Sequence, residues 1–290
     1  MKPCPPPLAE IKAPAYNVPP LACDCHVHVF GPANQFPYSP ARSYTPQDCP
    51  LEMLEKLHKT LGFDRCVIVH GGAHGTDNRT TLDALARSPR TIRGVAVIPS
   101  GLPDATIDAM NKAGMRGCRM STVVSGGAGF EHLDALADQC ANFGWHVVLH
   151  FGKAGELVAL APKLKKLRVP FILDHLGRIT GAEGVTSEAF KTLDSLMDNG
   201  NCWIKLASLY RLSSDPHPYN DMIPMIHRVA AKRPGRILWG SNWPHPIYSG
   251  VMPDDGDLVD LIPLWIPDPV VQKRMLVDNP ERLYRFSQAD

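Results

Sequence analysis

Short apolar runs recur along this chain and alternate with segments whose apolar residues return every three or four positions. Eight of the runs predict β-strands, at residues 22–30, 65–70, 94–98, 117–120, 146–151, 170–175, 203–207 and 236–240. Helical spacing occurs at 51–57, 105–113, 133–143 and 190–197, and a last helix is expected over 275–286 with a break at Asp278-Asn279-Pro280. This alternation predicts parallel βαβ units in an α/β fold.

The connection after the first strand separates the two folds that such units build. A doubly wound sheet would place a glycine-rich nucleotide loop there, whereas this chain has His-Val-His-Val-Phe-Gly-Pro at 26–32. We therefore predict a (β/α)8 TIM barrel over residues 21–290, a length that suits one such domain. Residues 1–20 are rich in proline, whose fixed φ favours an extended arm lying on the barrel or on a neighbouring subunit.

Composition excludes several classes of function. The formal net charge is +1, which leaves no field to hold a polyanion, so nucleic acid is not expected as a partner. No apolar stretch is long enough to cross a membrane and the first residues lack the core of a signal peptide, so a cytoplasmic protein is expected. The 8 cysteines are dispersed and form no C-x-x-C pair, which predicts reduced, buried thiols.

The first predicted strand carries polar residues at every second position. Asp24, His26 and His28 alternate with apolar neighbours, so a period of two predicts all three side chains on the interior face of the barrel. Two imidazoles near the end of a strand can bind a metal, polarise a carbonyl or transfer protons. The His-x-His motif alone is also compatible with a buried, purely structural pair.

Ionisable residues recur where the other strands end, and this recurrence favours chemistry. Because βα loops converge at the C-terminal ends of barrel strands, side chains placed there meet at one site. A structural role gives no reason for such a gathering. The residues concerned are His70 and His74 after the second strand, Arg119 in the fourth, His150 in the fifth, His175 and Arg178 at the sixth, and Asn242 and His245 after the eighth.

These motifs resemble the amidohydrolase superfamily, and within it the 2-pyrone-4,6-dicarboxylate lactonase branch. The resemblance covers nearly the whole chain, from Cys23 to Tyr284. It rests on His-x-His at 26–28, on Asp174-His175-Leu176-Gly177-Arg178, and on Trp239-Gly240-Ser241-Asn242-Trp243-Pro244-His245-Pro246.

The resemblance implies a distorted (β/α)8 barrel that opens a small anionic lactone without a metal or other cofactor. In that branch, histidines polarise the lactone carbonyl and arginines bind the substrate carboxylates. The matching residues here are the histidines His26, His28 and His175, the arginines Arg119, Arg178 and Arg211, and the binding-site residues Tyr44 and His74. His150 and His245 are further candidates for substrate binding.

One position departs from the hydrolases of the branch. They carry an aspartate after the eighth strand as general base, and the matching residue here is Asn242. An amide cannot take a proton from water near neutral pH, and general base catalysis contributes roughly 10²–10⁴-fold. A bound lactone would still be polarised, so a hydroxyl of the substrate itself, held at high effective concentration, can attack in place of water.

The chain is in this respect most similar to the galactarolactone isomerases of the branch. That similarity implies conversion of D-galactaro-1,5-lactone to the 1,4-lactone, with His26, His28, His175 and Asn242 as the catalytic residues. The uncharged segment 121–127 after the fourth strand, where the lactonase has further basic residues, indicates one substrate carboxylate fewer.

Three alternatives stay open at this stage. Hydrolysis could persist if a histidine or a metal activates water, and zinc could bind at His26, His28 and His175, with His150 as a further ligand. A non-catalytic sugar-acid binding protein is the third possibility, although binding alone does not require several imidazoles near one carbonyl. The remaining histidines that are expected at the surface are His58, His132, His217 and His227.

Overall fold

Eight parallel strands form the predicted barrel in this computed structural model, which describes residues 3–88, 91–124 and 127–287. The strands neighbour one another in chain order, from β1 to β8. Each overlaps one of the predicted apolar runs. Their bounds are β1 Cys23–Val27, β2 Arg65–Val69, β3 Ile92–Ala96, β4 Met115–Ser121, β5 His146–His150, β6 Phe171–Leu173, β7 Cys202–Ala207 and β8 Ile237–Gly240.

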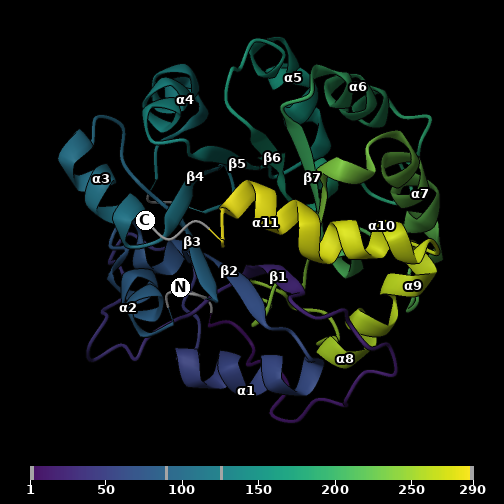
Figure 1. The fold of residues 1–290 in the computed structure, drawn as a ribbon, viewed down its shortest axis with the longest axis horizontal. Helices are drawn as coiled ribbons and strands as arrows, with labels where there is room; N and C mark the ends of the chain where they lie inside the picture. Colours follow the sequence, from purple (N-terminus) through teal and green to yellow (C-terminus); the bar gives the residue numbers. More distant parts are fainter. Residues whose placement is uncertain (1–2, 89–90, 125–126, 288–290) are drawn as a thin grey trace.

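Helices surround the barrel, and the C-terminal ones cross its end (Figure 1). Of the outer helices, α1, α3, α4 and α6 lie where the apolar spacing predicts them. The helices are α1 Leu51–Leu61, α2 Arg79–Arg87, α3 Asp104–Lys112, α4 Leu133–Asn142, α5 Ala154–Leu164, α6 Glu188–Leu196, α7 Ile223–Lys232, α8 Asp255–Asp260, α9 Ile262–Trp265, α10 Pro269–Lys273 and α11 Asn279–Tyr284.

The last helical segment continues where its sequence predicts a break, since Asp278 and Asn279 both keep right-handed helical dihedral angles. A π-helical turn, Arg274–Asp278, precedes α11, and Pro280 lies in the first turn of α11, where its missing N–H leaves no donor unsatisfied. Leu283 and Tyr284 of α11 then pack into the barrel interior. The helix therefore seals the end of the barrel at which the strands begin (Figure 1).

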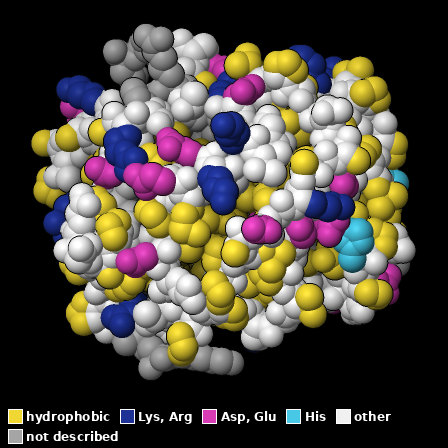
Figure 2. Space-filling view, turned by 90° about the horizontal axis from the view of Figure 1, so that it is seen from below, with side chains coloured by type: hydrophobic (Ala, Val, Ile, Leu, Met, Phe, Trp, Pro, Cys, Tyr) yellow, Lys and Arg dark blue, Asp and Glu magenta, His cyan; other side chains and the backbone are white. Residues whose placement is uncertain are grey.

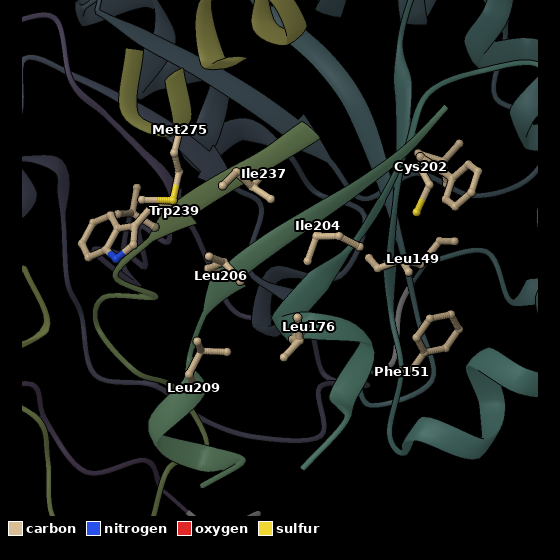
Figure 3. Packing of buried hydrophobic residues seen from close by; sticks show 14 of the residues in the cluster. Leu149, Phe151, Leu176, Cys202, Ile204, Leu206, Leu209, Ile237, Trp239 and Met275 are labelled. Atoms are coloured by element: carbon tan, nitrogen blue, oxygen red, sulfur yellow. The ribbon is translucent and has the colours of Figure 1, made fainter. Parts of the chain in front are cut away.

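Apolar side chains form two layers, one on each side of the sheet. The larger layer lies between the strands and the helices, and Figure 3 shows part of it, with Leu206 of β7 near Trp239 of β8 and Ile204 farther along β7. The smaller layer fills the barrel interior. It consists of Cys23, Cys25, Val67, Val69, Val95, Val148, Ile172, Trp203, Leu238, Leu283, Tyr284 and Phe286.

Strand β1 departs from the strict alternation expected of it. Asp24 points toward helix α1, where its carboxylate lies 3.4 Å from Nε2 of His58, whereas its neighbour Cys25 faces the interior. The pairing with β2 shifts register between Asp24 and Val27. Because such a bulge adds one residue, His26 also points inside. The expectation that Asp24 shares a face with His26 is therefore wrong, as is the surface position expected for His58, which is buried.

The end of β8 returns to β1 and closes the barrel. The backbone N–H of Asn242 donates to the carbonyl of His26 (2.8 Å), and the N–H of His28 donates to the carbonyl of Trp243 (2.9 Å). Gly240 approaches so closely that an added Cβ would lie 2.5 Å from the Cβ of His26. This seam holds both histidines of the first strand beside Asn242.

The proline-rich segment lies against the C-terminal helices. The hydroxyl of Tyr16 donates to Oε1 of Gln272 (2.8 Å), and its N–H donates to Asp260 (2.9 Å). Lys12 pairs with Asp257. The division of the chain into an arm at 1–20 and a barrel domain at 21–290 stays a prediction.

The surface carries charges of both signs. Figure 2 shows one side of the molecule, on which lysine and arginine side chains are interspersed with aspartate and glutamate. No helix among the described residues is long and apolar enough to cross a membrane. His132, His217 and His227 are exposed as expected, and all eight cysteines are free and buried, which confirms the prediction.

Gly240→Ala tests the seam. The added methyl group would collide with the backbone and Cβ of His26, so we expect a loss of about 1–3 kcal/mol in the free energy of unfolding, the range found for overpacked cores. Urea denaturation measures it. Gly155→Ala in α5 is the matched control, because its Cβ would have no neighbour within 4 Å and alanine favours a helix. Equal stabilities for the two variants would contradict the tight closure.

Candidate active site

A pocket of about 190 Å³ opens where the barrel strands end. Its lining comes from the strands and loops that the sequence analysis singled out, since every strand of a parallel barrel delivers its last residues to the same end. A larger groove, about 540 Å³, lies on the outer face between α6 and α7 and is lined by no histidine. The lining of the strand-end pocket is His28, Tyr44, Arg119, Val123, Val124, His150, His175, Arg178, Ser208, Arg211, Asn242, Pro246 and Ile247.

Two histidines of the pocket are fixed in one tautomer by backbone carbonyls. Nδ1 of His28 lies 2.7 Å from the carbonyl oxygen of Val69, and Nδ1 of His175 lies 3.0 Å from that of Ala207. A carbonyl only accepts, so each Nδ1 carries the hydrogen and each Nε2 keeps a lone pair. Burial lowers the pKa of both imidazoles to about 3, helped by the positive charge of Arg119. Both are therefore neutral near pH 7.

Beneath them lies a buried cluster of charges centred on Asp174. Nζ of Lys205 is 3.1 Å from one carboxylate oxygen, and Nη2 of Arg119 is 3.2 Å from the other. Nδ1 of His26 lies 3.4 Å from Asp174. Burial alone would raise the pKa of Asp174, but Lys205, His26 and Arg119 hold it well below its ordinary value. The carboxylate is therefore charged and faces a cation at each of its oxygens.

The other two arginines of the pocket lie next to each other and lack a carboxylate partner among the described residues. Burial and the charge of Arg211 both lower the pKa of Arg178, and Nε of Arg178 has no hydrogen-bond partner in the described part of the chain. Arg211 donates to the carbonyl of Pro246 (2.8 Å). Half-buried guanidinium groups in this state favour binding of an anion, for which arginine offers paired donors.

Asn242, which the resemblance matches to the general base of the hydrolases, lines the pocket. Its φ of 69° lies in the left-handed region, which asparagine tolerates better than most residues. Its Nδ2 lies 3.2 Å from the hydroxyl of Tyr210. Among the described residues that line the pocket, none is Asp or Glu.

Left-handed backbone is concentrated around this site. Conformations of this kind cost on the order of 1 kcal/mol or more for residues other than glycine and are retained mainly at functional positions. The remaining structure must compensate for them. The residues concerned near the pocket are His175 (φ 52°), Arg178 (65°), Ser208 (58°), Asn242 (69°) and His245 (58°).

Eight of the eleven predicted site residues line the pocket, and three do not. His26 is fully buried, with its ring centroid 4.9 Å from that of His175. His74 accepts from the N–H of Gly31 and thereby fixes a loop. His245 lies behind Asn242, where it contacts other polar groups. The eight that line the pocket are His28, Tyr44, Arg119, His150, His175, Arg178, Arg211 and Asn242.

Sequence reasoning missed Lys205, Ser208 and Tyr210. Lys205 is fully buried in β7, and the signal that could have revealed it is a lysine inside the apolar run 203–207. Of the uncharged segment 121–127, Val123 and Val124 line the pocket, while 125–126 lie outside the described residues.

The candidate metal ligands do not fit a zinc centre well. Atoms of His26, Asp174 and His175 that could bind an ion lie within 4.8 Å of one another. However, both oxygens of Asp174 already face the cations Lys205 and Arg119, and a divalent ion would lie beside these two positive charges. Their repulsion opposes a metal at these histidines.

The comparisons with known proteins agree with this architecture. The amidohydrolase family model matches residues 23–286. The chain is 39% identical to a 2-pyrone-4,6-dicarboxylate hydrolase of Comamonas testosteroni, with 95% of this chain and 94% of that protein covered. It is 32% identical to a D-galactarolactone isomerase of Agrobacterium fabrum, again with 95% and 94% covered.

A solved structure gives the same result for the fold. The crystal structure of a protein from Agrobacterium tumefaciens, without ligand, superimposes with a TM-score of 0.83 at 31% identity and covers 94% of this chain and 98% of that one. Fold, strand-end histidines and full-length similarity agree, and the chain belongs to the amidohydrolase family.

Proposed function

We propose that this enzyme isomerises a carboxylated sugar lactone, converting D-galactaro-1,5-lactone to the 1,4-lactone. One observation carries the proposal: the described lining of the pocket offers neutral histidines and arginines but no carboxylate that could take a proton from water. Of the similar proteins, one is named a 2-pyrone-4,6-dicarboxylate hydrolase and another a D-galactarolactone isomerase.

The first step is binding and polarisation. Arg178 and Arg211 bind the free carboxylate of the substrate, since they are the cations of the described pocket lining without a carboxylate partner. The lactone carbonyl lies near Arg119 and the imidazoles, where positive charge and hydrogen bonds stabilise the oxyanion that develops. Asn242 positions the substrate by a hydrogen bond.

The second step exchanges one ester bond for another. The 4-hydroxyl oxygen attacks C1, the C1–O5 bond breaks, and the proton that leaves O4 ends on O5. A neutral imidazole with a free Nε2, such as His28 or His175, can accept this proton and return it. No water is consumed, so the reaction does not need a carboxylate that activates water.

Hydrolysis of the lactone is the second candidate function. The observation that favours it is the 39% identity to a protein named as a hydrolase, which exceeds the 32% to the named isomerase. The two reactions give different products from one substrate: a second lactone or an open diacid.

Following pure D-galactaro-1,5-lactone by NMR distinguishes them. We expect the wild type to form the 1,4-lactone at least ~10²-fold faster than the diacid, because an attacking hydroxyl on the substrate has a high effective concentration. Rapid formation of diacid would support the hydrolase, and binding without turnover would support a binding protein.

Asn242→Asp should add hydrolysis to the same pocket. A carboxylate at this position can take a proton from water, so we expect diacid formation to rise about 10²-fold. Asn220→Asp, which introduces the same charge at an exposed position, is the matched control and should leave the product ratio unchanged. If the Asn242→Asp protein gained no hydrolysis, the role assigned to this position would be wrong.

The proposed reaction needs no metal. We expect protein purified without chelator to contain less than about 0.1 equivalent of zinc by elemental analysis, because Lys205 and Arg119 repel a divalent ion at the histidines. Prolonged dialysis against a chelator should leave turnover unchanged. Stoichiometric zinc whose removal abolishes turnover would contradict the proposal.

Because the imidazoles of His28 and His175 are neutral in the fold, we expect the free energy of unfolding to fall in acid. Their pKa is about 6.5 in the unfolded chain and about 3 in the fold, so below about pH 6.5 the unfolded state binds protons that the native state does not. Each group then costs up to about 1.4 kcal/mol per pH unit, and the full stability is present above about pH 6.5. Urea denaturation at about pH 7.5, 6.5 and 5.5 measures this. His175→Gln should reduce the slope, while Tyr44→Phe should keep it.

A further inference from the structure

A chain of buried polar groups stands behind Asn242. Nδ2 of Asn242 lies 3.2 Å from the hydroxyl oxygen of Tyr210, which lies 2.8 Å from Nδ1 of His245. Nε2 of His245 is 3.2 Å from a carboxylate oxygen of Asp255. Tyr210, His245 and Asp255 are at most 6% exposed, and they are absent from the described lining of the pocket.

The chain fixes which end of the Asn242 amide faces Tyr210. A carboxylate only accepts, so Nε2 of His245 donates to Asp255, and in the neutral imidazole Nδ1 then accepts from the Tyr210 hydroxyl. The phenol oxygen then accepts from Nδ2 of Asn242, and from Nε of Arg211 at 3.4 Å. An amide has one donor end and one acceptor end, so its Oδ1 is turned away from Tyr210.

We propose that Tyr210, His245 and Asp255 are positioning residues that fix the amide of Asn242 with its oxygen toward the pocket, where it accepts a hydrogen bond from a substrate hydroxyl. This inference rests on the proposed function, and it specifies what the site recognises: a lactone that carries a hydroxyl donor at this point. The amide oxygen thus accepts a hydrogen bond as a carboxylate oxygen would, but it does not take the proton.

The electrostatics of the chain preserve this orientation. Burial lowers the pKa of His245, but Tyr210 and Asp255 raise it to about 9. Burial raises the pKa of Tyr210, and the neighbouring His245 and Arg211 bring it below its ordinary value. The proton between Tyr210 and His245 can therefore lie on either group, and in both cases the phenol oxygen is an acceptor for Asn242.

Three separate segments bring the chain together. Tyr210 comes from the loop after β7, Asn242 and His245 from the loop after β8, and Asp255 from the first turn of α8. The loop after β8 is turned by left-handed residues at Asn242 and His245, and the N–H of His245 donates to the carbonyl of Asn242 (2.8 Å). The strained turn places the ring of His245 against Tyr210, with ring centroids 5.5 Å apart.

Tyr210→Phe, made in the wild type and in the Asn242→Asp protein, tests the inference. In the wild type we expect kcat/KM for lactone consumption to fall about tenfold or more, since the amide loses the acceptor that orients it. In the Asn242→Asp background we expect less than a threefold loss, because both ends of a carboxylate accept and nothing needs to be oriented. A merely structural role for Tyr210 would cost the same factor in both backgrounds and would overturn the inference.

Asp255→Asn provides a second test should the phenylalanine variant fold poorly. An amide at position 255 can donate to His245 and reverse the direction of the chain, so that Tyr210 donates to Oδ1 of Asn242 and turns it. We again expect a loss with asparagine at position 242 and little with aspartate there. Tyr248→Phe is the matched control, since its ring lies 4.9 Å from that of Tyr210 but its hydroxyl is outside the chain of hydrogen bonds.

The outcomes separate the inference from the proposed function. If the wild type turns out to hydrolyse the lactone, the isomerase proposal fails, yet the dependence of the Tyr210 effect on residue 242 can still be measured on that hydrolysis. If isomerisation is observed but Tyr210→Phe has no effect in either background, the isomerase stands and the positioning chain is wrong.

Discussion

The buried ion cluster around Asp174 is the interaction on which the site depends. A lone carboxylate in this interior would be prohibitively costly, and it is tolerated because Lys205 and Arg119 neutralise it from β7 and β4. Asp174 follows β6 directly, and His26 of β1 approaches the same oxygen as Lys205. Four strands are thereby held to one point beneath the pocket.

The cluster also sets the sign of the charge that the pocket presents. Asp174 neutralises Lys205 and, in part, Arg119. Arg178 and Arg211 have no carboxylate partner among the described residues. The histidines add no positive charge, since burial keeps them neutral. What remains is a small positive pocket with uncharged proton carriers, which suits an anionic ester whose carbonyl must be polarised.

Much of this arrangement was predictable from the sequence because barrel topology determines which residues meet. Once the strands alternate with helices, residues at strand ends must come together, and eight of the predicted site residues do line one pocket. The bulge in β1 was not predictable, because alternation assumes an even register and nothing in Asp24-Cys25-His26 signals the shift. Tyr210 and Asp255 were not predicted as site residues for another reason: they lie behind Asn242 and outside the described lining of the pocket.

Helix α11, which seals the far end of the barrel, limits how solvent reaches the pocket. Leu283 and Tyr284 fill the interior from below, so packed side chains separate the strand-end pocket from the other end of the barrel. Water in the pocket therefore cannot leave through the end of the barrel at which the strands begin. If a lactone binds in the strand-end pocket, the side chains that line it would decide whether its carbonyl meets a hydroxyl of the ligand or water.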